Sequence, residues 1–222
     1  MITEFNNGWD VKTTVTYDNM LSDAVTITDA AGDLIVGDEI ADTMAPIGPV
    51  IVVKKVESDS NASSRVSVGY RYGGLLLHRK GLGSLGFKLL KTTDGQTGVA
   101  TTSTYKQEYP YTGTPLSTIQ IAADGTSLLN SATNTLAQRS TVHNGILPFI
   151  DISTQIAYQI DSEHHTLATT VTDNNYDRWG NLERSTVTVK NGSSTLHTTL
   201  SVNSFGNEGS YEQQMGRLLS TT

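Results

Sequence analysis

Apolar and polar residues alternate along several short stretches of the chain. Over residues 9–17, Val11, Val15 and Tyr17 fall on one face, and polar side chains fall on the other. The same alternation recurs over residues 64–72. Side chains of a β-strand point alternately to its two faces, so a period of two is typical of a strand with one buried face. The pattern predicts an all-β chain of half-buried strands.

Turn signals, most of them containing glycine, separate these stretches. Asn-Gly and Asp-Gly flanked by β-prone residues are the strongest short signals for a β-hairpin. Such signals and two related turns lie at Asp94-Gly95, Asp124-Gly125, Asn144-Gly145, Asp161-Ser162-Glu163, Gly180-Asn181 and Asn191-Gly192. Most of them lie about 16 to 30 residues apart, which predicts strands longer than the usual five or six residues. We therefore expect long antiparallel strands joined as hairpins.

The remaining segments complete this picture. Residues 24–28 are expected to form a further strand, followed by a turn at residues 29–33. Residues 37–49 contain two Gly and two Pro and predict an irregular loop, which leads into a hairpin of residues 50–58 and 64–72. Residues 126–136 admit a short helix as an alternative, which their Thr and Asn content disfavours.

Composition agrees with the strand pattern. Thr, Val, Ile and Tyr favour strands and are common in this chain. Its 222 residues are enough for one or two domains with a sizeable core. With 36% hydrophobic and 17% charged residues, the chain does not have the composition of a disordered protein.

Charge and cysteine content exclude several kinds of partner and site. The net charge of −7 argues against nucleic acid and anionic membranes, because both require a basic surface. The absence of Cys rules out disulfides and thiolate zinc sites. No apolar run reaches transmembrane length, and the N-terminus lacks the basic and apolar regions of a signal peptide. We expect any export signal to lie outside this segment.

Motifs for cofactors and catalysis are weak. Residues 81–86 match Gly-x-Gly-x-x-Gly, but the segment that follows is too short for the helix of a dinucleotide site and is ended by a turn, and no acidic residue sits at the end of a following strand. His164 and His165 lie near Asp161 and Glu163, yet adjacent strand residues point to opposite faces and would not chelate together. No pair of carboxylates stands out as that of a glycosidase. We expect no cofactor, no metal and no enzymatic activity.

Aromatic residues suggest an alternative function. Trp9, Trp179 and the tyrosines are the side chains with which an extracellular β-rich module would recognise glycan or a receptor. Aromatic residues beside turns more often pack in a core or across strands, so we favour packing. Two glycosylation acceptor patterns, beginning at Asn61 and Asn191, fall in expected turns.

The most informative stretch is residues 176–182, with the sequence Tyr-Asp-Arg-Trp-Gly-Asn-Leu. Gly180 supplies the positive φ of a tight turn, and Asn181 tolerates the same region. The carboxylate of Asp177 is placed to accept hydrogen bonds from amides of the turn. Tyr176 and Leu182 are then expected to face the packed side, one on each strand.

This stretch resembles the Tyr-Asp-x-x-Gly-Asn/Arg-Leu signature of the Rhs, or YD-repeat, family, and is closest to the shell-forming component of insecticidal toxin complexes. Residues 70–74, 81–87 and 105–113 resemble, in order and spacing, the Tyr-x-Tyr-x-Gly, Gly-Arg-Gly-x-Leu-Gly-Phe and Tyr-x-Gln-x-Phe-Pro-x-x-Gly segments of that family. Leu82 replaces the usual Arg, and Tyr109 replaces the usual Phe. Together with a second turn region near residues 207–218, the resemblance covers most of the chain.

The resemblance implies a structural role. YD repeats wind into a spiralling sheet, or shell, that encloses a toxic C-terminal domain of a secreted bacterial toxin. Residues 1–222 would then be a single segment of a larger shell protein, with residues 1–113 and 114–222 as sub-blocks if the segment divides. Partners would be the toxin cargo and other shell or translocation components, outside the cell or at its surface, with no direct membrane insertion by this segment. Self-cleavage in the family uses a separate aspartate motif, which this chain lacks.

The residues that we expect to carry the structural repeat fall in two groups. One group sets the repeat turn, and the other sets a close strand crossing. They are Tyr176, Asp177, Gly180, Asn181 and Leu182 in the first group, and Gly81, Gly83, Gly86 and Phe87 in the second.

Overall fold

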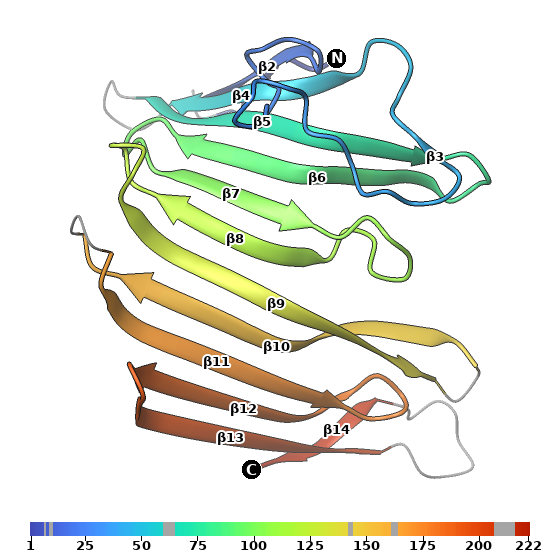
Figure 1. Ribbon diagram of the computed structural model, residues 1–222, viewed down its shortest axis with the longest axis vertical. Coiled ribbons are helices and arrows are strands. Elements are labelled where there is room, and N and C mark those ends of the chain that lie inside the picture. The colour runs from blue at the N-terminus through green and yellow to red at the C-terminus, as the bar shows by residue number, and fades with distance from the viewer. Residues whose placement is uncertain (7, 9–10, 60–64, 142–143, 161–163, 207–215) are drawn as a thin grey trace. The chain divides into compact units, whose positions relative to one another are not determined.

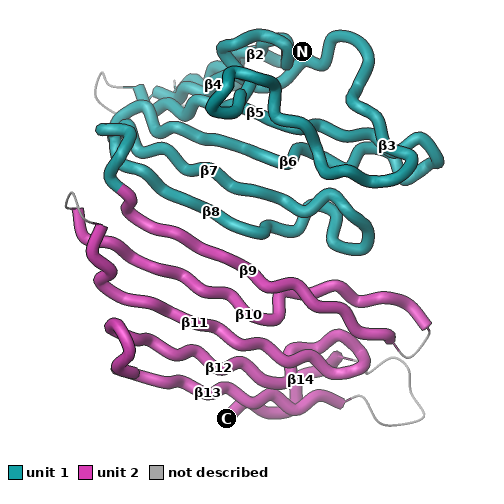
Figure 2. The backbone as a smooth tube through the Cα atoms, viewed as in Figure 1, with its two compact units in different colours: residues 1–127 teal, residues 128–222 magenta. Residues whose placement is uncertain are grey.

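The computed structural model describes residues 1–6, 8, 11–59, 65–141, 144–160, 164–206 and 216–222 (Figure 1). These residues form β-strands, turns and loops, and none of them lies in a helix. The chain divides into two compact units, Met1–Ser127 and Leu128–Thr222 (Figure 2). The all-β prediction is confirmed.

The first unit is an antiparallel sheet in which strands adjacent in the sheet mostly follow one another in sequence. Its strands are β1 (Glu4–Asn6), β2 (Lys12–Asn19), β4 (Ile51–Asp59), β5 (Arg65–His78), β6 (Gly83–Asp94), β7 (Ala100–Tyr105) and β8 (Pro115–Ile121), in that order, and the short β3 (Thr43–Met44) pairs with β5. Long hairpins therefore dominate, as the spacing of the turn signals predicts.

The second unit repeats this plan. Each strand pairs antiparallel with the next, in the order β9 (Leu128–Ser140), β10 (Ile146–Tyr158), β11 (Thr166–Tyr176), β12 (Leu182–Asn191), β13 (Ser194–Gly206) and β14 (Arg217–Thr221). Residues 128–136 belong to a strand, so the helix considered for residues 126–136 is wrong. Their Thr and Asn residues fit an extended backbone better than a helix.

The core is small and lies in the first unit. Among the described residues, the buried apolar side chains are Val25, Val52, Leu76 and Leu85, and the buried polar ones are Thr26 and Gln107. Most other strand residues are only partly covered, because a single sheet layer has little against which to pack its faces. Hydroxyl pairs across strands, such as Ser103 with Thr118 at 3.1 Å, satisfy polar groups on these faces.

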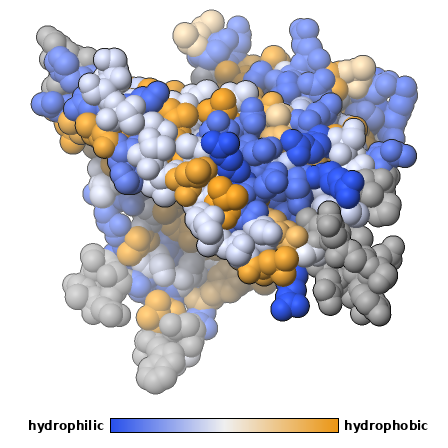
Figure 3. All heavy atoms as spheres, turned by 90° about the horizontal axis from the view of Figure 1, so that it is seen from below, coloured by the Kyte–Doolittle hydropathy of each residue, from blue (hydrophilic) through white to orange (hydrophobic). Residues whose placement is uncertain are grey.

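Apolar side chains also remain exposed on the second unit. They lie on its last two strands and comprise Leu196, Leu200 and Val202 of β13 and Leu218 and Leu219 of β14. The surface seen in Figure 3 carries apolar groups as separate orange patches among polar side chains. Single exposed apolar residues of this kind are normal on protein surfaces.

Strands β4 and β5 separate partway along their length. They pair only from Lys55 opposite Gly69 to Asp59 opposite Arg65. Beyond Gly69, the same edge of β5 is bordered by residues 25–27, where the Tyr72 amide donates to the Val25 carbonyl at 2.7 Å, and then by β3. Residues 24–28 therefore form only isolated bridges and not the expected strand, because their backbone pairs with β5 at a single residue, Tyr72.

Candidate functional site

A tight turn occupies residues 177–181, between β11 and β12. The Oδ1 atom of Asp177 accepts hydrogen bonds from the amides of Trp179 at 2.8 Å and Asn181 at 2.9 Å. Its Oδ2 atom accepts one from Nδ2 of Asn181 at 2.9 Å. The single carboxylate thus satisfies three donors that the reversal of the chain leaves unpaired.

Gly180 adopts a left-handed conformation, with φ at 91°. Its amide donates to the Asp177 carbonyl at 3.2 Å, and the Asp177 amide donates to the Asn181 carbonyl at 2.9 Å. A Cβ atom at this position would lie 3.2 Å from Cδ2 of Leu147 in β10. Both the backbone and the available space therefore favour glycine here.

The turn is also fixed to neighbouring strands of its unit. Tyr176 lies opposite Leu182 in the β11–β12 ladder, and its ring contacts that of Phe149 with centroids 4.8 Å apart. Arg139 of β9 donates to the carbonyl of Tyr176 and, at 3.2 Å, to Oδ1 of Asn175. One arginine thereby connects β9 to the end of β11, across the intervening β10.

Gly81, Gly83 and Gly86 lie in and beside the β5–β6 hairpin. All three have positive φ, yet a Cβ atom on any of them would meet nothing within 4 Å. The space around their Cβ positions is therefore open, and their positive φ fits the backbone conformation of the hairpin. Phe87 lies opposite Leu75, and its ring contacts that of Tyr72 at 4.7 Å.

Gln107 is the structural residue that sequence reasoning did not single out. Its side chain is fully buried, and Nε2 donates to the carbonyls of Gly74 and Gly86, both at 2.7 Å. Its Oε1 atom accepts from the amide of Asp38 at 2.9 Å. One amide group therefore joins β5, β6 and the loop after residue 37. A signal was present, because Gln107 is the Gln of the segment at residues 105–113.

Aspartate caps recur at other turns. The carboxylate of Asp124 accepts from the Ser127 hydroxyl and from the amides of Ser127 and Thr126, and these hydrogen bonds lower its pKa to about 2. The amides of Thr97 and Gln96 lower the pKa of Asp94 in the same way. Asp177 therefore shares a feature that recurs in this chain, an aspartate carboxylate that accepts hydrogen bonds from the backbone amides of its own turn.

The metal site considered at His164 and His165 has no complete set of ligands among the described residues. No group of three or more His, Asp or Glu side chains lies close enough to hold a metal within the described ranges. Residues 161–163, which complete the cluster at His164 and His165, lie outside the described residues, as does His143. Residues 83–94, following the Gly-x-Gly-x-x-Gly pattern, form β6 and not the helix that a dinucleotide site requires.

The aromatic residues give the glycan hypothesis little support. Trp9 lies outside the described residues, while Trp179 is half-buried with the Arg178 guanidinium 5.3 Å from its ring centroid.

Of the two glycosylation acceptor patterns, the one at Asn191 lies at the end of β12, one residue before the tip of an exposed hairpin, and the one at Asn61 falls outside the described residues. No helix among the described residues is long and apolar enough to cross a membrane.

The chain was compared with known proteins. No protein-family model matches it, and no curated protein matches it in sequence. Among solved structures, a chain of the Photorhabdus luminescens Tc holotoxin pore aligns with a TM-score of 0.69 and 10% identity, over 100% of this chain and 14% of that one. The complex TcdB2-TccC3-Cdc42 contains a chain that aligns with a TM-score of 0.68 and 11% identity, over 99% of this chain and 15% of that one.

A third solved structure is TcdB2-TccC3 without its hypervariable C-terminal region. It aligns with a TM-score of 0.65 and 11% identity, over 98% of this chain and 14% of that one. The chain therefore spans about one seventh of the Tc toxin chains that it matches. At this level of identity the likeness establishes the fold: the chain has the Rhs-like fold of part of these proteins.

Proposed function

We propose that this chain is a section of the wall of a YD-repeat shell that encloses a toxic C-terminal domain of a secreted bacterial toxin. The observation that carries the proposal is the fold, a succession of long antiparallel hairpins that matches Tc toxin chains along the whole length of this chain. One of the solved structures with this fold is TcdB2-TccC3 without its hypervariable C-terminal region, and such a region is the part that a shell of this kind would hold.

The physical demands on such a wall match the features of this chain. A wall must be continuous from strand to strand, and here neighbouring strands form antiparallel ladders within each unit, with a separation between β4 and β5 over part of their length. Enclosure excludes proteases and solvent from the cargo and requires no reacting group. We therefore infer that residues 1–222 are one segment of a larger, non-enzymatic scaffold that functions outside the cell or at its surface.

Within the wall, the proposed repeat residues have distinct tasks. Tyr176 and Leu182 pack across the ladder, Asp177 and Asn181 close the turn, and Gly180 permits its backbone conformation. The partners of the wall are the toxin cargo and the other shell and translocation components. None of these contacts calls for nucleic acid or a membrane.

The reading frame on both sides of the chain provides the first test. We expect further Tyr-Asp-x-x-Gly units and, after them, a C-terminal domain of unrelated composition. A complete gene that encodes neither would contradict the proposal.

Protease protection provides the second test. In the complete parent protein the C-terminal domain should resist trypsin, and it should become cleavable when Gly180→Val opens the wall. Cleavage at the same rate in the wild-type parent and in the domain expressed alone would refute enclosure.

A glycan array probed with wild-type chain and with Trp179→Ala separates this function from the glycan-binding alternative.

A further inference from the structure

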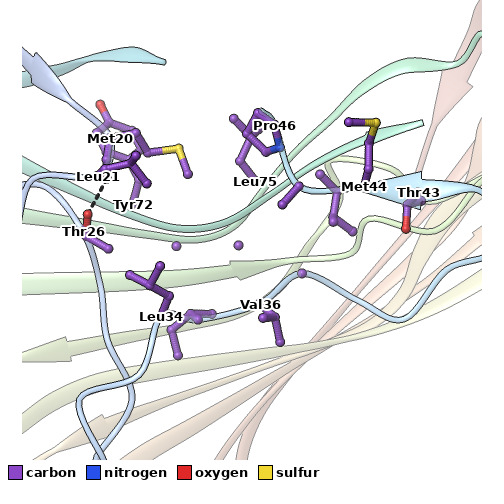
Figure 4. A pocket seen from close by; sticks show the side chains of 16 residues that line it. Met20, Leu21, Thr26, Leu34, Val36, Thr43, Met44, Pro46, Tyr72 and Leu75 are labelled. Atoms are coloured by element: carbon purple, nitrogen blue, oxygen red, sulfur yellow. Dashed lines mark hydrogen bonds between the residues drawn. The ribbon is translucent and has the colours of Figure 1, made fainter. Parts of the chain in front are cut away.

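An apolar cavity lies in the first unit where β4 and β5 separate. Its floor is the part of β5 from Tyr72 to Leu76, and its walls come from the segment between β2 and β4. Three parts of that segment contribute, at residues 20–26, 34–37 and 43–46. Figure 4 shows their side chains around one hollow space. The cavity has a volume of about 360 Å³, within the range of small-molecule sites.

The lining of this cavity is almost entirely apolar. Met20 and Met44 contribute thioethers, and Leu34, Val36 and Leu75 contribute branched aliphatic side chains. None of the lining residues carries a charge. Such a surface offers dispersion contacts and removal from water, without an ionic partner for a charged group.

The hydroxyl groups of the few polar side chains in the lining already donate their hydrogens to backbone carbonyls. Thr26 donates to the carbonyls of Met20 and Ser22, and the first of these hydrogen bonds is drawn in Figure 4. Thr43 donates to the Ile40 carbonyl at 2.7 Å, and the Tyr72 hydroxyl donates to the Val53 carbonyl at 2.9 Å. No side-chain hydroxyl of the lining is left to donate to a ligand.

We propose that this cavity is a binding site for a small, uncharged, apolar molecule of about two or three aromatic rings. A charged ligand would lose its hydration without gaining a partner, which is costly in an apolar site. Water at this surface would find few polar partners, and an apolar ligand would cover Leu34 and Val36, which are 58% and 76% exposed. Enclosure of a cargo does not require this site.

Methionine methyl groups provide a direct readout. The chain has 4 Met, of which Met20 and Met44 line the cavity, whereas Met1 is 82% exposed and does not line it. The whole chain, labelled with ¹³C at the methionine methyl groups, is titrated with the uncharged fluorescent probe N-phenyl-1-naphthylamine. We expect the Met20 and Met44 signals to shift and saturate together with the rise in fluorescence, while the Met1 signal stays unchanged.

Two substitutions only three residues apart in sequence separate the cavity from the surface around it. Met44→Glu places a carboxylate in the lining and should weaken binding of the probe by about tenfold or more. Ile47→Glu makes the same chemical change at a residue that is 90% exposed and does not line the cavity, and it should leave the affinity within about twofold. If Met44→Glu lowers the melting temperature to that of the assay, Leu34→Glu, at a rim residue that is 58% exposed, replaces it.

A ligand pair tests the charge preference on the wild-type chain alone. Naphthalene should displace the probe, and 1-naphthoate at the same concentration should not. The proposal is overturned by an absence of saturable Met20 and Met44 shifts, or by equal competition from both ligands. It is also overturned by equal loss of binding in Ile47→Glu and Met44→Glu, which would indicate adsorption to the exposed apolar rim.

Discussion

Replacing Gln107 by Leu should disconnect three segments of the first unit. The substitution keeps the side chain's size but removes two donors and one acceptor, leaving the Gly74 and Gly86 carbonyls and the Asp38 amide without this partner. A polar group that is left buried and unpaired costs roughly 1–3 kcal/mol. The hydrogen bond to Gly74 is buried and the other two are partly buried, so we assign the full range to the first and about 1 kcal/mol to each of the others.

The expected loss in the free energy of unfolding is therefore about 3 to 5 kcal/mol. Urea denaturation followed by far-UV circular dichroism measures this loss, and amide hydrogen exchange locates it in β5 and β6. Gln96→Leu is the matched control, because Gln96 is exposed and donates only at 3.3 Å to the Arg65 carbonyl. Its effect should stay within about 0.5 kcal/mol.

A loss below about 1 kcal/mol for Gln107→Leu would refute the reasoning. It would mean that water or a rearranged backbone satisfies the three groups equally well. Gln107→Glu adds a second measure, since its ionised carboxylate has no hydrogen to donate to the two carbonyls. It should destabilise the first unit at least as much at pH 7 and recover some stability as the pH falls and the carboxyl is protonated.

Three further changes test the turns. Gly180→Val should lower the free energy of unfolding by about 2–4 kcal/mol, because it forces a β-branched residue to a φ of 91° and against Leu147; calorimetry should show a smaller loss for Gly180→Asn, and an unchanged melting temperature for the Val variant would disprove the turn geometry. Asp177→Ala should cost about 2 kcal/mol through the loss of its hydrogen bonds to the turn, measured by urea denaturation, and an effect within experimental error would show that water replaces the carboxylate. Asp124 has a folded pKa of about 2, below its ordinary value of 3.8, so its contribution is complete above about pH 4 and disappears as the pH falls toward 2. Stability measured between pH 5 and 2 should fall less steeply in Asp124→Asn than in the wild type, and identical slopes would contradict the pKa shift.

The strand pattern was readable from sequence because it is local. A period of two and the Asn-Gly and Asp-Gly turns depend on neighbours within a few residues, and they located hairpins such as β6–β7 and β12–β13. The same locality let the sequence place Asp177 as an acceptor in its turn, which the hydrogen bonds to Trp179 and Asn181 bear out.

Long-range contacts were not readable in this way. The sequence around residues 24–28 has the alternation of a strand, but whether it forms one depends on which edge is free. That edge exists only because β4 stops pairing with β5 at Gly69. Burial of Gln107 likewise depends on carbonyls 33 and 21 residues away, at Gly74 and Gly86. The apolar cavity arises from the same departure of β4, so no local pattern marks it.

The separation of β4 from β5 also affects how the first unit would respond to mechanical load. One side of β5 is held by a continuous ladder to β6, from Val68 to His78. Its other side is held in turn by β4, by single bonds to residues 25–27, and by the two residues of β3. A force that pulls on β5 across its strand direction would therefore meet less resistance on this side than at the β5–β6 ladder, and β5 would separate from its β4 side before it unzips from β6.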